Sequence, residues 1–115
     1  MIPSLFPLEV YRGDTGAWCF VLWNDAAQTN PVDLTGATVI AEIRSKPGVD
    51  PAVPLSCYVT LPNTIDVVLA PSDSAQLLML VGCWDLRVTY PWGPVETFVA
   101  GAVLVTPDIT GSVPT

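Results

Sequence analysis

Short stretches in which apolar and polar residues alternate run through this 115-residue chain. A period of two is typical of β-strands that bury one face. The pattern is clearest in residues 37–44, 64–70 and 83–90, and residues 95–106 continue it. The predicted inward-facing sets are Ala37, Val39, Ala41 and Ile43; Ile65, Val67 and Leu69; Trp84, Leu86, Val88 and Tyr90; and Val95, Thr97, Val99, Gly101, Val103 and Val105.

Other segments complete the set of predicted elements. Residues 8–11 suggest a first edge strand, and the continuous apolar run 17–23 is consistent with a strand buried on both faces. Residues 55–60 and 64–70 are expected to pair as a hairpin. Only residues 71–82 look helical, with proline at the start, a capping-box spacing from Asp73 to Gln76, and Gly82 at the end.

Twelve prolines and eight glycines punctuate these segments. Six to seven short strands at this spacing predict an all-β fold, an immunoglobulin-like antiparallel β-sandwich with one short helix. The length allows one domain, residues 1–115, with a short apolar N-terminal arm (1–8) and a C-terminal tail (107–115).

The composition of the chain narrows the classes of function that it can have. Charged residues make up 13 % and apolar residues 50 %, which excludes a disordered chain. The net charge of −7 argues against nucleic acid or an anionic membrane as partner. Histidine, the commonest general base and metal ligand, is absent. Carboxylates are scattered, and cysteine spacing gives no zinc site. We therefore expect no enzyme, no catalytic residues, no cofactor and no metal.

The sequence leaves open whether its three cysteines are free thiols or whether two of them form a disulfide. Cys19 and Cys83 lie on two predicted core strands, at a spacing that suits an immunoglobulin inter-sheet disulfide or, alternatively, two buried thiols. The third residue, Cys57, makes the set odd, and the proline-broken N-terminus does not resemble a signal peptide. We therefore expect synthesis in the cytoplasm, and because disulfides are rare there we favour free thiols over the disulfide.

The tripeptide Arg12-Gly13-Asp14 matches an integrin ligand. A glycine–aspartate pair after a strand is also ordinary turn chemistry, and short motifs occur readily by chance. We interpret it as a turn.

Apolar surface is the informative anomaly, because so small a sandwich cannot hide half of its residues. Trp92 lies in a turn bounded by Pro91 and Pro94, and with Tyr90 and Pro94 it forms a candidate protein interface. The alternative is that Trp92 folds back over the open end of the sandwich. Leu5 and Phe6 of the N-terminal arm are further interface candidates.

Several motifs recur in an order that resembles a known family. They are residues 12–15 (RGDT), 32–39 (VDLTGATV), 43–48 (IRSKPG), 69–75 (LAPSDSA), 84–89 (WDLRVT) and 101–105 (GAVLV). Together they resemble small immunoglobulin-like virion domains of tailed bacteriophages, in particular the N-terminal domain of the phage baseplate upper protein family. The turn at residues 91–94 departs from that family, whose domains usually have a polar turn there.

The resemblance implies a non-enzymatic structural component of a virion, which docks on baseplate, tail or major capsid proteins. It offers no catalytic residues. Repeated copies or a homo-oligomer are expected, with neither nucleic acid nor membrane as partner. One alternative is a head decoration or cement protein that stabilises the capsid. A second is a carbohydrate-binding module that recognises the host through Trp92 and Tyr90.

Overall fold

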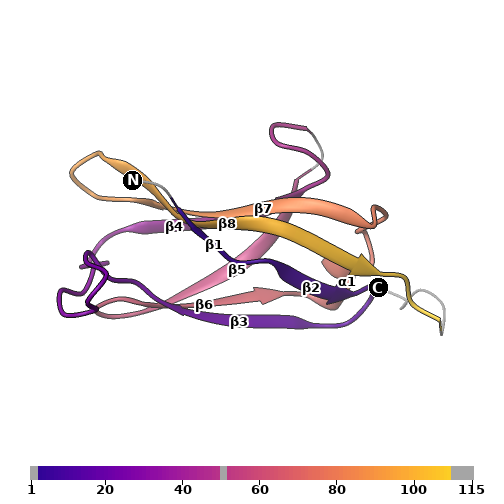
Figure 1. Cartoon of the computed structure of the whole chain (residues 1–115), viewed down its shortest axis with the longest axis horizontal. Coiled ribbons are helices and arrows are strands. Elements are labelled where there is room, and N and C mark those ends of the chain that lie inside the picture. Colours follow the sequence, from indigo (N-terminus) through magenta and orange to yellow (C-terminus); the bar gives the residue numbers. More distant parts are fainter. Residues whose placement is uncertain (1–2, 50–51, 110–115) are drawn as a thin grey trace.

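The computed structural model describes residues 3–49 and 52–109, and all structural statements refer to this part of the chain. Figure 1 shows its eight strands and one short helix: β1 (Ser4–Leu5), β2 (Leu8–Tyr11), β3 (Gly16–Val21), β4 (Thr38–Arg44), β5 (Val53–Thr60), β6 (Thr64–Leu69), α1 (Pro71–Ser74), β7 (Val81–Thr89) and β8 (Val95–Thr106). The predicted all-β fold with one short helix is confirmed. The described strands number eight instead of six to seven because Ser4–Leu5, within the predicted N-terminal arm, forms the additional strand β1.

These strands form one sheet that curls into two layers. Its order is β1-β8-β7-β4-β5-β6-β3, and β2 also pairs with β8. Strand β5 belongs to both layers, because residues 53–55 pair with β4 and residues 56–60 pair with β6. In Figure 1 the upper layer holds β4, β7 and β8, and the lower layer holds β3 and β6. Apart from the first strands, this pairing is that of the two sheets of an immunoglobulin sandwich.

The N-terminal strands depart from the predicted antiparallel pattern. Strands β1 and β2 run parallel to β8, with Ser4 beside Val99 and Leu8 beside Val103. The chain then turns at residues 12–15 and crosses to the lower layer as β3, which pairs only with β6 among the described strands. The sheet therefore has two edges, β1 with β2 and β3. We call the gap between them the seam.

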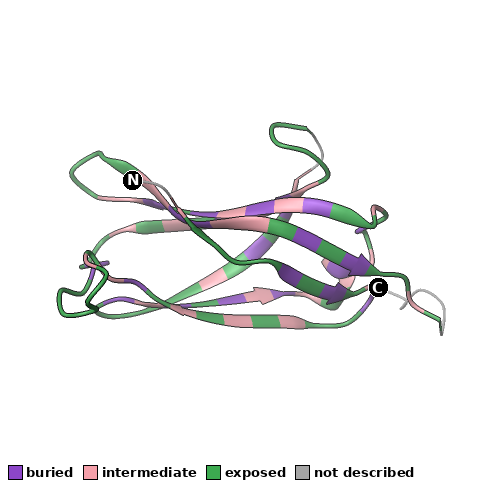
Figure 2. Ribbon diagram, viewed as in Figure 1, coloured by how far each residue is buried: buried purple, intermediate pink, exposed green. Residues whose placement is uncertain are grey.

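The hydrophobic core lies between the layers. Figure 2 shows buried residues alternating with more exposed ones along β7, as a strand with one buried face requires. The predicted inward faces of β4, β6 and β7 are confirmed, including fully buried Ile43, Ile65, Val67, Leu69, Leu86 and Val88. Leu8, Leu22, Val32, Leu34 and Leu77 complete the core from loops and from β2.

The prediction for the run 17–23 is wrong. Strand β3 is an edge strand of the lower layer, and its residues alternate between exposed and half-buried. Trp18 and Phe20 pack against the core, whereas Ala17, Cys19 and Val21 are exposed on the outer face. An uncharged run is compatible with a strand that is covered on both faces, but the exposed Ala17, Cys19 and Val21 show that no element of the described residues covers the outer face here.

Two further local predictions fail for physical reasons. The register between β7 and β8 shifts at Leu86/Arg87, so the alternation of β8 changes phase. As a result Phe98 is buried and Val95 is 57 % exposed, against the predicted face. The helix spans only Pro71–Ser74, and it has no side-chain cap because the residue at its N-cap position is Ala70, whose side chain carries no hydrogen-bonding group. Gly82 lies within β7.

Phe6 connects the two layers across the seam. Its ring meets the ring of Phe20 edge to face, with centroids 5.1 Å apart. Its carbonyl oxygen accepts the indole N–H of Trp84 at 2.7 Å. Gly101 lets this carbonyl approach β8 closely, since a Cβ at position 101 would lie 2.4 Å from the Phe6 oxygen. The N-terminal segment is thereby anchored to both β7 and β3.

The substitution Trp84→Phe tests this anchor. It keeps an aromatic ring in the core but leaves the Phe6 carbonyl without its donor, so the free energy of unfolding should fall by about 1–3 kcal/mol. Urea unfolding measures the change. Trp92→Phe is the matched control, because Trp92 is 67 % exposed and should lose little. Equal stability of the Trp84→Phe variant and the unaltered chain would contradict the anchor.

Candidate functional site

The turn between β7 and β8 brings together three of the five predicted interface residues. Tyr90 donates its backbone N–H to the Pro94 carbonyl at 2.9 Å, and Gly93 donates its N–H to the Tyr90 carbonyl at 3.0 Å. Gly93 has a φ of +116°, a conformation that side-chain-bearing residues rarely adopt. The backbone of the turn is therefore well defined, and it fixes where Trp92 stands.

Trp92 is stacked and exposed at the same time. Its ring lies on the ring of Tyr90, with centroids 4.7 Å apart and planes 20° from parallel, and the residue is 67 % exposed. Tyr90 is half-buried, and its hydroxyl donates to the Glu96 carboxylate at 3.4 Å. Burial and the Glu96 charge raise the pKa of Tyr90. The Trp92 ring thus presents a free face on a fixed support, and it does not fold back over the open end.

Leu5 and Phe6 lie elsewhere, and they differ from each other. Leu5 stands beside Ala100 of β8 and is 85 % exposed. Phe6 is the seam anchor described above, and its ring is partly covered by Phe20. Leu5 therefore offers a free apolar side chain, whereas Phe6, which is 41 % exposed, offers only part of its ring.

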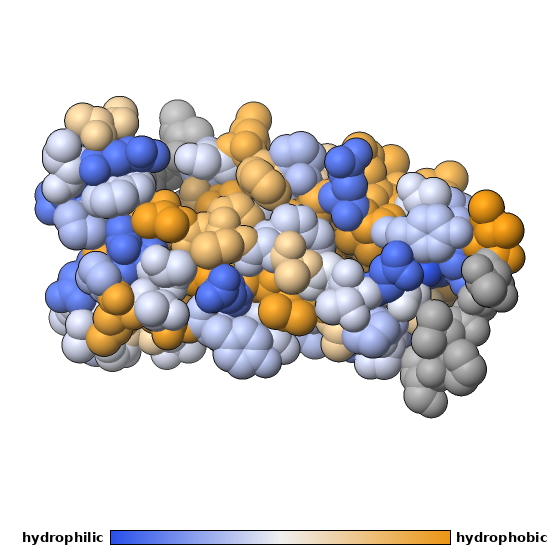
Figure 3. Space-filling model, turned by 90° about the horizontal axis from the view of Figure 1, so that it is seen from below, coloured by the Kyte–Doolittle hydropathy of each residue, from blue (hydrophilic) through white to orange (hydrophobic). Residues whose placement is uncertain are grey.

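A second group of exposed apolar residues was not predicted. Leu78, Leu80, Val81 and Leu104, here called the distal patch, are between 44 % and 80 % exposed. Val81 pairs with Leu104, and Val105 donates its N–H to the Leu80 carbonyl. Figure 3 shows apolar residues at this end of the molecule, where β7 begins and β8 ends. The five-residue apolar run 77–81 was the available signal, but assigning it to a helix hid it.

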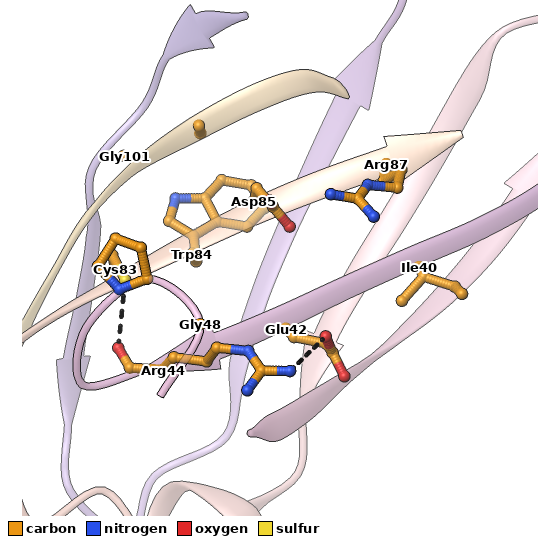
Figure 4. A pocket seen from close by; sticks show the side chains of 11 residues that line it. Ile40, Glu42, Arg44, Gly48, Cys83, Trp84, Asp85, Arg87 and Gly101 are labelled. Atoms are coloured by element: carbon orange, nitrogen blue, oxygen red, sulfur yellow. Dashed lines mark hydrogen bonds and ion pairs between the residues drawn. The ribbon is translucent and has the colours of Figure 1, made fainter. Parts of the chain in front are cut away.

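The outer face of the upper layer forms a shallow trough of about 830 Å³ under the loop that follows β4 (Figure 4). Glu42, Arg44, Asp85 and Arg87 line it together with Ile40. Arg44 and Glu42 form an ion pair at 3.5 Å. Because charges of both signs alternate, the trough has no strong preference for one ligand charge. Cys83 also lines the trough, and its thiol donates to the Arg44 carbonyl at 3.5 Å.

The Arg12-Gly13-Asp14 segment is a turn, as interpreted. Arg12 donates its Nε–H to the Leu77 carbonyl at 2.7 Å, and buried Gly13 donates its N–H to the Ser74 hydroxyl at 3.0 Å. Asp14 closes the turn through its N–H to the Tyr11 carbonyl. These contacts dock the turn on α1.

All three cysteines are free, as the favoured prediction had it, but Cys19 and Cys83 are not the buried thiols that it expected. Cys19 lies on the outer face of the lower layer, whereas Cys83 lies on the outer face of the upper layer. They point to opposite sides of the molecule, so no inter-sheet disulfide joins them, and neither is a fully buried thiol. Cys57 is half-buried, and burial raises its thiol pKa.

The search for metal and membrane features gives two findings. In residues 3–49 and 52–109, no three side chains among cysteine, aspartate and glutamate converge on a point that could hold a metal ion. Helical structure in the same ranges includes no segment with the length and apolarity needed to cross a bilayer.

Comparisons with known proteins give little. No family model matches the chain, and no curated protein matches it. Among solved structures, the chain is similar to a mutant of the SrpA adhesin from Streptococcus sanguinis, with 16 % identity and a TM-score of 0.48. The match covers 95 % of this chain and 59 % of that chain, so the chain spans about three-fifths of the adhesin's length.

The Cys19 thiol should lose its proton at a higher pH than an ordinary thiol, although the residue is exposed. Partial desolvation and then the hydrogen bond and negative charge of neighbouring Asp66 raise its thiol pKa above the ordinary value. In a chain carrying Cys57→Ser and Cys83→Ser, the pH midpoint of iodoacetamide labelling should be higher for the folded protein than in urea. Asp66→Asn should lower the folded midpoint. Identical midpoints with and without Asp66 would contradict this electrostatic effect.

Proposed function

We propose that the chain is a non-enzymatic structural component of a tailed-phage virion, synthesised in the host cytoplasm. It is an immunoglobulin-like module that docks in repeated copies on baseplate, tail or capsid proteins. The proposal takes the virion setting from the family that residues 12–15, 32–39 and 84–89 resemble. It takes the docking role from the distribution of exposed apolar side chains.

That distribution is the observation that carries the proposal. Trp92 is 67 % exposed at one end of the β7–β8 hairpin, and Leu78 and Leu80 are 80 % and 60 % exposed near the other. Burying one large apolar side chain is worth about 1.5–3 kcal/mol. A chain with only 13 % charged residues has few polar groups to offset these surfaces. Contact with neighbouring proteins would cover them.

Trp92 has the properties of an interface anchor. It is a large aromatic at a turn tip, and the Tyr90 ring and the Tyr90–Glu96 hydrogen bond hold it in place before any partner arrives. An anchor that is already ordered loses little conformational entropy on binding. Aromatic residues of this kind often contribute most of the binding energy of an interface.

A second candidate function follows from the same ring. The free face of the stacked Trp92 would also suit the apolar face of a sugar, so host recognition through a carbohydrate remains the rival function. Glycan binding by the isolated protein would favour it, since a docking module needs no sugar. A head decoration role differs from a tail role only in where the protein sits, which imaging of labelled particles decides.

The substitution Trp92→Ala tests docking. A host that supplies the variant to phage lacking their own copy should yield particles carrying at least tenfold less of this protein, because an anchor residue is worth about 2 kcal/mol or more. Quantitative mass spectrometry of purified particles measures the amount. Tyr58→Ala is the control, since Tyr58 is an aromatic residue that is 60 % exposed on the lower layer.

Two outcomes would count against the proposal. Wild-type incorporation of the Trp92→Ala chain would remove the anchor role, and absence of the unaltered protein from particles would remove the virion role. The folded state of both variants is checked by urea unfolding, in which the free energy of unfolding should stay within about 0.5 kcal/mol of that of the unaltered chain, as for exposed side chains generally.

A further inference from the structure

Strand β3 presents a free hydrogen-bonding edge. It pairs with β6 on one side, and no described strand pairs with it on the other. Leu22 donates its N–H to the Asn63 carbonyl, so even-numbered positions of this strand direct their backbone groups toward β6. By alternation, the N–H and C=O groups of Ala17, Cys19 and Val21 point away from the sheet. In an immunoglobulin sandwich the first strand occupies this place, but here β1 and β2 pair with β8.

This edge has none of the usual protection against pairing. Exposed edges normally carry charged residues, proline or a bulge. The six residues of β3, GAWCFV, include no charge and no proline. On the face seen in Figure 3, strongly hydrophilic residues are most frequent at the left end, and elsewhere a few of them stand among apolar and weakly polar residues. The strand is therefore a template for another uncharged strand.

We infer that β3 pairs with β3 of a second copy of this chain, antiparallel, with the two-fold axis at Cys19. In this register Ala17 lies opposite the partner's Val21, and Cys19 lies opposite the partner's Cys19. Each of the three opposed pairs exchanges two N–H···O bonds, so all six free backbone groups of each strand are satisfied. No other register satisfies all of them symmetrically.

Side chains on both faces fit this pairing. On the inner face Trp18 comes opposite the partner's Phe20, and the two-fold axis repeats the pair. Both residues are only half-buried in the single chain. Cross-strand aromatic pairs stabilise sheets, and these two would cover the remaining exposed parts of the rings. On the outer face only small or apolar side chains meet.

The net charge of −7 does not prevent a second copy from pairing at this edge. The nearest acidic residue on the outer face is Asp66, which lies beside Cys19 on β6. Two Asp66 carboxylates would be three strand spacings apart, about 14 Å. That exceeds the screening length of about 8 Å at physiological salt. The pairing therefore keeps the two Asp66 carboxylates apart.

The expected affinity is low for two free molecules. Six residues from each chain are fewer than the roughly 20–30 a side of a standard interface. In an assembly that already holds copies close together, the same contact gains from the high effective concentration. The inference deepens the proposed function, which calls for repeated copies, and rests on it in that respect.

Cysteine cross-linking tests the register in the purified, full-length protein. Opposed residues of such a pair have Cα atoms about 5.5 Å apart, within the range that a disulfide spans. With Cys57→Ser and Cys83→Ser, the chain keeps Cys19 alone and should oxidise to a covalent dimer with copper phenanthroline. In a chain with all three cysteines replaced by serine, Ala17→Cys should cross-link to Val21→Cys and not to itself. Ser56→Cys, on the same outer face away from the edge, is the control.

Sedimentation of the chain with native residues tests the interface without cross-linking. The unaltered protein should show concentration-dependent dimers, and Cys19→Lys, which opposes two lysines at the axis, should weaken them at least tenfold. Ser56→Lys, with the same change of charge, should leave them intact. A protein that stays monomeric at millimolar concentration, or Ala17→Cys that cross-links to itself as readily as to Val21→Cys, would overturn the inference. Either result can occur while incorporation into particles still depends on Trp92, so the two proposals fail separately.

Discussion

The indole N–H of Trp84 bonds to the carbonyl oxygen of Phe6 while the Phe6 ring packs on Phe20, and these two contacts hold the ends of the curled sheet together. They keep the N-terminal strands on the upper layer, parallel to β8. The consequence is an asymmetric sandwich. Side chains close its seam instead of backbone hydrogen bonds, and β3 is left with an open edge.

The same framework displays the apolar surfaces. The long β7–β8 hairpin places the Trp92 turn at one end and the distal patch at the other, and the nine residues of β7 between them span about 30 Å. A core with fully buried Leu86, Val88 and Val103 keeps the hairpin rigid between them. Two apolar ends and one open edge are three separate places at which the proposed contacts with neighbouring proteins would form.

Sequence patterns predicted β4, β6 and β7 well because each buries one face, and alternation records that directly. They failed for β3 because an uncharged run does not say whether a neighbour covers it. They failed at Phe98 because a register shift leaves no mark in periodicity. The Trp92 turn was found from its proline-bounded aromatic, but the distal patch was missed because the run 77–81 was assigned to a helix. Cys19 and Cys83 are separated because each lies on the outer face of its strand. The spacing of cysteines in the sequence does not show on which face of a strand each one lies.

Amide hydrogen exchange of the dilute protein tests the open seam most directly. If side chains alone close it, the amides of Ala17, Cys19 and Val21 should exchange orders of magnitude faster than those of Trp18 and Phe20, which bond to β6. Slow exchange at all five positions, unchanged on further dilution, would mean that a backbone partner within the same chain already covers this edge. It would contradict the structural basis proposed here for both the curled sheet and its pairing.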